Sequence, residues 1–138
     1  MIEEAINARE VEISLMGNLS PVCSPYAGEI MPAKEFYDFE AKYEDESSKL
    51  LLPAPISEDT LNHIKDCAVR AYKICECRGF ARVDFFVEKT TGEVFLNEIN
   101  TLPGFTEISM YPKLWGLADV SIKELITRLI GLAIERDD

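Results

Sequence analysis

The sequence predicts an α+β fold in which helices pack on an antiparallel sheet. Three observations support this prediction: strand-like alternation of apolar and polar residues at 9–16 and 81–100, helical periodicity at 58–77 and 121–136, and turn-forming residues between these segments. A chain of 138 residues is long enough to bury the core of one domain without disulfide or metal staples. We therefore expect one sheet, with both helices packed on the same side of it.

The composition excludes several classes of protein. Apolar residues make up 47% of the chain and charged residues 28%, which is typical of a folded domain. The net charge of −11 disfavours a broad nucleic-acid-binding face and binding to anionic membranes, but it allows a small anionic ligand that a metal cation bridges to the protein. No apolar run approaches the roughly 18–20 residues of a membrane span, and the N-terminus lacks a signal-peptide pattern.

The four cysteines do not indicate a metal site. Cys75 and Cys77 form a C-x-C pair, while Cys23, Cys67 and the single His63 lie at spacings unlike those of a zinc finger. We expect four reduced, mostly buried thiols in a cytosolic protein.

The first half of the chain predicts one strand followed by turns. In 9–16, the apolar side chains alternate with polar ones, which indicates a half-buried strand. Residues 18–35 contain three prolines and a glycine, so we expect turns and at most one short strand near Ile30–Met31. Segment 36–49 begins with aromatic residues and ends highly charged, which predicts a solvated loop, although 36–43 alone suits an edge strand.

Two helices and a hairpin follow. Ser57 is a typical N-cap, and the apolar spacing after it predicts a helix over 58–77 with Cys67 and Cys75 on its buried side. A Thr-Gly tip at 89–92 joins strands 81–88 and 93–100. Residues 102–116 hold two prolines and predict irregular structure. The capping box at 121–124 starts a last helix with a continuous apolar stripe.

The hairpin places polar residues where chemistry is possible. Asp84 and Glu98 face the same side if they pair, and Arg82 then pairs with Asn100. Two facing carboxylates with an amide oxygen suit Mg²⁺ or Mn²⁺, which take remaining ligands from water and substrate phosphates. An ordinary solvated hairpin face would show similar residues. The rigid turn at 100–104 adds a possible anion nest, so the pattern favours metal-assisted phosphoryl or acyl-phosphate chemistry.

These segments resemble a known family. The stretches Gly-Phe-Ala-Arg-Val-Asp-Phe-Phe at 79–86 and Leu-Asn-Glu-Ile-Asn-Thr-Leu-Pro-Gly-Phe-Thr at 96–106 are similar to the C-terminal ATP-grasp signature of D-alanine–D-alanine ligases. The segments Arg-Glu-Val-Glu-Ile at 9–13 and Phe-Tyr-Asp-Phe-Glu-Ala-Lys-Tyr at 36–43 also match. The resemblance therefore implies an ATP-grasp C-terminal lobe across nearly the whole chain.

The resemblance also implies a role for individual residues. Asp84, Glu98 and Asn100 resemble the ligands of two Mg²⁺ or Mn²⁺ ions that bridge the phosphates of ATP. Arg82 and the Gly104 amide resemble an oxyanion site. The remaining implied roles are adenine binding by Glu3 to Ile6, ribose binding by Glu10, base packing by Phe86, carboxylate binding at Ser109 and Met110, and lid closure by Lys42 and Tyr43. Ser109 is equally suited to cap a helix, and Glu10 alone would read as a solvent-facing strand residue.

The resemblance covers only part of a full ligase. Residues 1–138 are expected to form one partial domain, without the N-terminal domain or the phosphate-loop subdomain, so we expect a fragment that is inactive alone. The parent would use ATP and D-alanine in the cytoplasm to make D-alanyl-D-alanine for peptidoglycan, and it would be a homodimer. The fragment would self-associate through an exposed edge.

Other functions stay open at this point. Ligases that attach D-serine or D-lactate share these motifs, although Tyr43 argues against D-lactate because those relatives tend to carry histidine there. A metal–nucleotide-binding module without catalysis is a further alternative.

Overall fold

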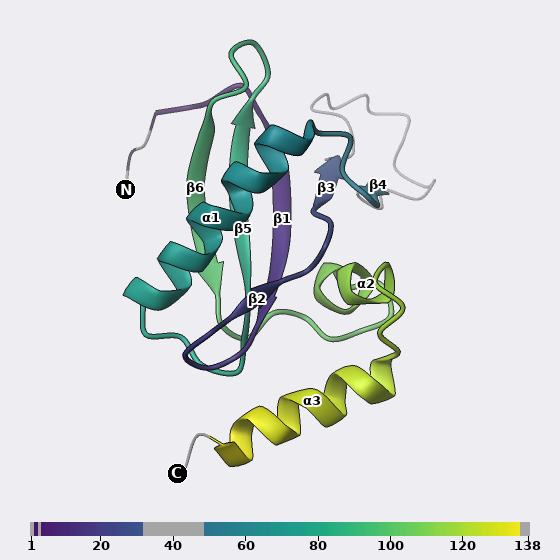
Figure 1. Ribbon diagram of the computed structural model, residues 1–138. Helices are drawn as coiled ribbons and strands as arrows, with labels where there is room; N and C mark the ends of the chain where they lie inside the picture. The colour runs from purple at the N-terminus through teal and green to yellow at the C-terminus, as the bar shows by residue number, and fades with distance from the viewer. Residues whose placement is uncertain (1, 3, 32–48, 136–138) are drawn as a thin grey trace.

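The computed structural model describes residues 2, 4–31 and 49–135 (Figure 1). Glu3, Lys42, Tyr43 and most of the expected loop at 36–49 lie outside the described residues. In chain order the elements are β1 (Ala8–Met16), β2 (Val22–Cys23), β3 (Gly28–Met31), β4 (Lys49–Leu51), α1 (Glu58–Ile74), β5 (Phe80–Glu88), β6 (Val94–Asn100), α2 (Met110–Gly116) and α3 (Ile122–Glu135). The predicted α+β architecture is confirmed.

The strands form one antiparallel sheet in the order β4-β3-β1-β5-β6, and the short β2 pairs with the end of β1. The three long strands expected from the sequence therefore lie side by side, with β1 between β3 and β5. β3 is the short strand expected near Ile30–Met31. Local alternation did not indicate β2, which has only two residues.

β1 is buried on both faces, although its alternation predicted a half-buried strand. Every residue from Val11 to Gly17 is buried, including the polar Glu12 and Ser14. The apolar face packs under α1, whereas on the polar face the Ser14 hydroxyl donates a hydrogen bond of 3.3 Å to the backbone carbonyl of Tyr111. The prediction was wrong because alternation tells which residues share a face and not which element covers that face.

α1 covers the apolar face of the sheet. The Ser57 hydroxyl accepts a hydrogen bond of 3.1 Å from the backbone N–H of Thr60, which confirms the predicted N-cap. The residues that α1 buries in the core are Ile64, Ala68 and Tyr72. The helix ends at Ile74 and not at 77, because Glu76 adopts a left-handed φ of 52° and turns the chain towards β5.

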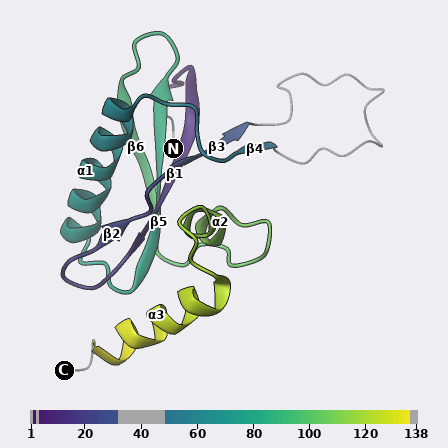
Figure 2. The ribbon, with the colours of Figure 1, turned by 45° about the vertical axis from the view of Figure 1, so that its right-hand side comes forward.

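α2 and α3 lie on the other side of the sheet from α1 (Figure 2). The expectation that both long helices pack on one side is therefore wrong, because the side chains of β1 alternate between two separate cores. The second core consists of Met16, Tyr111, Trp115, Val120 and Leu125. α2 itself was missed in the irregular segment 102–116, since Pro112 falls in its first turn, where proline is tolerated.

α3 is covered along only part of its apolar surface. Its predicted start is confirmed, since the Ser121 hydroxyl accepts a hydrogen bond of 3.2 Å from the backbone N–H of Glu124. Leu125 is fully buried, but the isoleucines on the adjoining side are 44–68% exposed: Ile122, Ile126, Ile130 and Ile134. None of the helices in the described part of the chain is long and apolar enough to cross a membrane.

The cysteines are free, as the sequence predicted, but they are not mostly buried. Cys77 is buried, Cys23 and Cys67 are partly exposed, and Cys75 is exposed. The expectation failed for Cys75 because it lies beyond the last residue of α1, where the helical spacing no longer applies.

Candidate metal and nucleotide site

The polar face of the sheet carries its side chains in rows across three strands. Glu12, Asp84 and Glu98 occupy directly opposed positions on β1, β5 and β6. The neighbouring row holds, in the same strand order, Ser14, Arg82 and Asn100. Opposed residues in antiparallel strands point to the same side. The register expected for the hairpin is therefore confirmed, and β1 adds a third acidic side chain to it.

The hairpin contains a bulge next to this site. Asp84 pairs with Glu98, but Phe85 pairs with Leu96, so Asn97 has no partner in the ladder. Strict alternation along β6 would put Leu96 on the same face as Glu98 and Asn100, but the extra residue interrupts the alternation. The bulge lies between the hairpin tip and the Asp84–Glu98 pair, and its extra residue shifts the register so that Glu98, and not Asn97, lies opposite Asp84.

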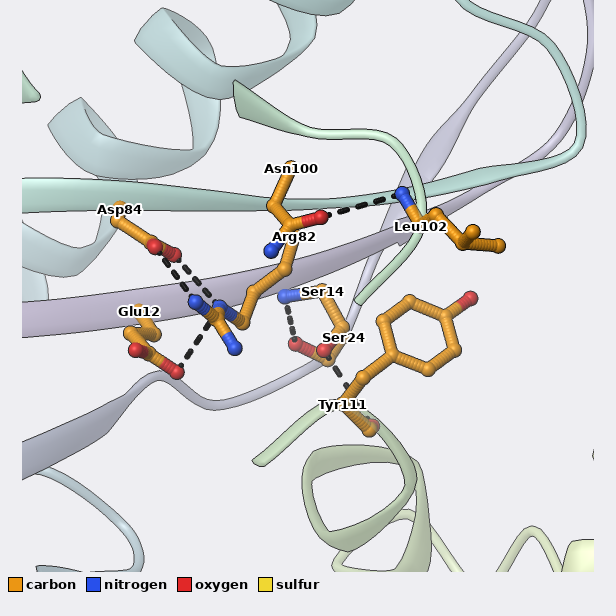
Figure 3. Close-up of polar contacts among 8 residues, drawn as sticks. All are labelled: Glu12, Ser14, Ser24, Arg82, Asp84, Asn100, Leu102 and Tyr111. Carbon is orange, nitrogen blue, oxygen red and sulfur yellow. Dashed lines mark hydrogen bonds and ion pairs between the residues drawn. The ribbon is translucent and has the colours of Figure 1, made fainter. Parts of the chain in front are cut away.

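Arg82 lies at the centre of the polar face (Figure 3). Its Nε and Nη2 donate hydrogen bonds of 2.8 and 2.7 Å to the two carboxylate oxygens of Asp84. Its Nε also lies 3.1 Å from Oε2 of Glu12. The hydrogen bonds to Asp84 raise the pKa of Arg82, so the guanidinium stays charged in a place where only 18% of its side chain is exposed.

Glu12 is the residue that the sequence analysis missed. Its side chain is 5% exposed, and Oε2 has no hydrogen-bond partner despite its proximity to Arg82. Burial, together with the nearby Asp84 carboxylate, raises the pKa of Glu12 to about 7, although Arg82 acts in the opposite direction. The available signal was that Glu12 shares a strand face with Glu10, which would have mattered once strand 9–16 was paired with strand 81–88.

The oxygen atoms of this face are the candidate metal ligands. Both oxygens of Asp84 accept hydrogen bonds from Arg82, and Asn100 Oδ1 accepts one of 3.1 Å from the backbone N–H of Leu102. Glu98 is exposed. Within residues 4–31 and 49–135, no three His, Cys, Asp or Glu side chains are arranged to hold a metal by themselves. Hard oxygen donors fit Mg²⁺ or Mn²⁺, provided that Asn100 and phosphate oxygens of a ligand complete the coordination.

The turn after β6 joins the polar face to the start of α2. A Cβ atom on Gly104 would lie 2.8 Å from the hydroxyl of Ser109, so a larger residue there would require this hydroxyl to move. That hydroxyl accepts a hydrogen bond of 3.0 Å from the backbone N–H of Thr106, and Ser109 occupies the N-cap position of α2 without capping it through its side chain. Met110, the first residue of α2, is buried.

A second part of the candidate site lies at the other end of β1. Glu10 pairs with Phe86 in the strand register, and both line a hollow of about 390 Å³ together with Ile6 and Lys89. The structure therefore brings together three of the residues expected to bind a nucleoside. A larger hollow of about 560 Å³, between the turn after β1 and the end of α3, contains none of the expected site residues.

These features define a class of protein. The sheet displays two opposed carboxylates, an amide and a guanidinium next to a glycine turn, and a hollow lined by Ile6, Glu10 and Phe86 lies further along β1. This is the arrangement expected of the C-terminal lobe of an ATP-grasp ligase.

Comparison with known sequences gives the family within that class. Residues 1–131 match the family described as the D-ala D-ala ligase C-terminus, and the chain belongs to this family. It is 54% identical over 138 residues to a D-alanine–D-alanine ligase of Clostridium novyi, and 54% identical to one of Clostridium acetobutylicum. These matches take in the whole chain but only 40% of each relative, so the chain spans well under half the length of these proteins.

Solved structures agree with this assignment. A D-alanine–D-alanine ligase from Coxiella burnetii superposes with a TM-score of 0.81 at 38% identity, over 97% of this chain and 34% of that one. A D-Ala:D-Ser ligase from Enterococcus faecalis gives a TM-score of 0.80 at 37% identity, over 94% of this chain and 37% of that one. The fold is therefore that of the C-terminal lobe of these ligases.

Proposed function

We propose that this chain is the C-terminal portion of an ATP-dependent D-alanine–D-alanine ligase, which joins two D-alanines for peptidoglycan synthesis and releases ADP and phosphate. The observation that carries the proposal is the register that opposes Asp84 to Glu98 and Arg82 to Asn100, in a chain of this family. The relatives named D-alanine–D-alanine ligase support the choice of substrate.

The nucleotide would bind where the start of β1 lies next to the end of β5, near Glu10 and Phe86. In the proposal, Glu10 accepts hydrogen bonds from the ribose, Ile6 and Glu3 flank the adenine, and Phe86 packs on the base. The support is that Ile6, Glu10 and Phe86 line one hollow. A hollow of about 390 Å³ falls within the usual range for small-ligand sites.

The phosphates would lie over the acidic row. Asp84, Glu98 and Asn100 would hold two Mg²⁺ or Mn²⁺ ions, which when bound neutralise phosphate charge and favour transfer to the carboxylate of the first D-alanine. Arg82 and the Gly104 N–H would stabilise the negative oxygen that develops when the second amine attacks the acyl phosphate.

The remaining residues would position and protect the substrates. Ser109 and the Met110 N–H would bind the carboxylate of the second D-alanine at the start of α2, where unpaired backbone donors accumulate. Lys42 and Tyr43 would close over the site and exclude water from the acyl phosphate. The parent would work as a cytoplasmic homodimer, while this partial domain, 1–138, would be inactive alone because half of the positioning groups belong to the rest of the ligase.

The alternatives from the sequence receive less support. Among the solved structures, a D-Ala:D-Ser ligase at 37% identity matches about as well as a D-alanine–D-alanine ligase at 38%. The curated relatives at 54% identity are named D-alanine–D-alanine ligases, which favours D-alanine. A D-lactate ligase is disfavoured by Tyr43. A binding module without catalysis remains testable, because it predicts nucleotide binding but no restored turnover.

Activity is tested by joining this chain to the N-terminal portion of the Clostridium novyi relative at the boundary of the match. We expect D-alanine-dependent release of ADP from the joined protein and none from the 138-residue chain alone. An inactive joined protein that binds Mg-ATP would favour the binding module. Turnover by the isolated chain would contradict the proposed incompleteness.

Nucleotide binding is tested by calorimetric titration of Mg-ATP into the chain and into Glu98→Gln. Glu93→Gln is the matched control, since Glu93 is an exposed glutamate of the same hairpin outside the site. We expect Glu98→Gln to weaken binding and Glu93→Gln to leave it unchanged. Equal heats for all three proteins would count against a metal site at Glu98.

A further inference from the structure

Arg82 is shared unequally between two buried carboxylates. It makes two well-aligned hydrogen bonds to Asp84, whereas its contact with Glu12 is a single approach of 3.1 Å that leaves Oε2 of Glu12 without a hydrogen bond. The Nε/Nη2 edge of a guanidinium forms such a fork with one carboxylate at a time, and here Asp84 takes it. Asp84 therefore holds Arg82 in this arrangement, and Glu12 offers Arg82 a second carboxylate whose Oε2 accepts no hydrogen bond.

The position of Glu12 is fixed by the fold. It lies directly opposite Asp84 on the neighbouring strand, and its side chain is 5% exposed. Among the described residues, Arg82 is the one basic side chain within 4.0 Å of a Glu12 oxygen. A buried acceptor without a donor is unfavourable, so a nearby donor that becomes free will turn to it.

The candidate metal site creates that situation. Both Asp84 oxygens are occupied by Arg82, yet Asp84 is one of the three proposed ligands. A divalent cation and a guanidinium compete for the same carboxylate, because each lowers the negative charge that attracts the other. Arg82 would then lose its main anchor at the moment when its charge is needed for the oxyanion.

We propose that Glu12 is a positioning residue that takes over the Arg82 guanidinium when Asp84 is engaged by a divalent cation. This inference rests on the proposed function for the identity of the cation site, but the exchange of partners concerns only side chains of this chain. Glu12 thereby keeps Arg82 on the polar face with its outer N–H groups free to bind an oxyanion.

The first experiment frees Arg82 from Asp84 by a mutation instead of by a bound cation. Asp84→Asn removes the charge that holds Arg82 and keeps the shape of the side chain. The readout is the solvent exchange rate of the Arg82 Nε–H, measured by NMR on ¹⁵N-labelled chain. We expect slow exchange in the wild type, in Asp84→Asn and in Glu12→Gln, because one carboxylate suffices. In the double variant Glu12→Gln/Asp84→Asn we expect exchange about tenfold faster, the factor that one charge-assisted hydrogen bond is worth.

The matched control is Glu10→Gln/Asp84→Asn, which removes a neighbouring carboxylate on the same strand face and should leave the exchange slow. A purely structural Glu12 would alter stability without this dependence on Asp84. Should the double variant not fold, Glu12→Asp/Asp84→Asn withdraws the carboxylate by one methylene and is expected to speed exchange partially. Fast exchange in Asp84→Asn alone, or slow exchange in both Glu12 double variants, would overturn the proposal.

A second arm adds Mg²⁺. We expect the Arg82 Nε–H to stay protected in the wild type and to exchange rapidly in Glu12→Gln. Loss of protection in the wild type, or protection in Glu12→Gln while the Asp84 signals shift, would contradict the exchange of partners. If Mg²⁺ shifts no signal near Asp84, the proposed metal site fails in this chain, and the Asp84→Asn arm still decides the role of Glu12.

Discussion

Replacing Arg82 with methionine tests how much the polar face depends on one cation. The substitution keeps most of the apolar stem but leaves Asp84 and Glu12, whose side chains are 11% and 5% exposed, without a counter-charge. Removing one partner of a buried ion pair typically costs about 3–5 kcal/mol. Because two carboxylates lose the same partner, we expect Arg82→Met to lower the free energy of unfolding by at least about 3 kcal/mol near pH 8.

The assay is urea unfolding of the metal-free chain in EDTA, with Arg128→Met as the matched control. Arg128 pairs with Glu124 on α3, where their side chains are 46% and 49% exposed, and such surface pairs contribute about 0–1 kcal/mol. Adding Glu12→Gln to Arg82→Met should recover part of the loss, since it removes one of the two stranded charges. Equal destabilisation by the two arginine substitutions would refute the view that Arg82 neutralises a buried acidic pair.

Three further predictions concern pH, backbone strain and association. The pKa of Glu12 is about 7 in the folded state against an ordinary value of 4.5, so the folded state binds this proton more tightly than the unfolded state. The free energy of unfolding should therefore fall by up to about 3 kcal/mol as the pH rises from about 4.5 to about 7. In urea unfolding with EDTA present, Glu12→Gln should abolish this fall. Gly17→Ala should lower the free energy of unfolding by about 2–4 kcal/mol in thermal unfolding, since a Cβ there would lie 2.8 Å from the backbone of Pro21 at a φ of +138°. Gly79 is the control, because its φ is +76° but the space around it is open, and Gly79→Ala should cost only about 1 kcal/mol. Equal losses for the two variants would contradict the clash at Gly17. The isolated chain should self-associate through the open edge of β6. Leu96 on this strand is 51% exposed, so Leu96→Lys should shift the mass measured by light scattering towards that of the monomer. A wild-type chain that is a monodisperse monomer at high concentration would contradict this prediction.

The sequence predicted the hairpin well because its information is local. The Thr-Gly tip and the alternation on both sides define the two strands. The pairs Asp84 with Glu98 and Arg82 with Asn100 also depend on the bulge, because the register next to the tip would by itself oppose Asp84 to Asn97. The bulge at Asn97 was not predictable, because one unpaired residue leaves the pattern of polarity on each side unchanged.

The errors share one physical cause, which is that single-chain patterns do not specify tertiary neighbours. Glu12 looked like the solvated side of a strand, and only its position opposite Asp84 makes it part of the site. α2 was missed because Pro112 masks a short helix that is held by burial of Tyr111 and Trp115. Which side of the sheet each helix covers depends likewise on the connections and not on helical periodicity.

The place of β1 in the sheet has a consequence for the order of folding. β1 and its partner β5 lie some 60 to 80 residues apart in the chain, since Met16 pairs with Phe80 and Ala8 with Glu88. The β5–β6 hairpin closes over a few residues and forms quickly, whereas β1 must wait for a long loop to close. We therefore expect the two hairpin members of the acidic row, Asp84 and Glu98, to come together before Glu12 joins them from β1.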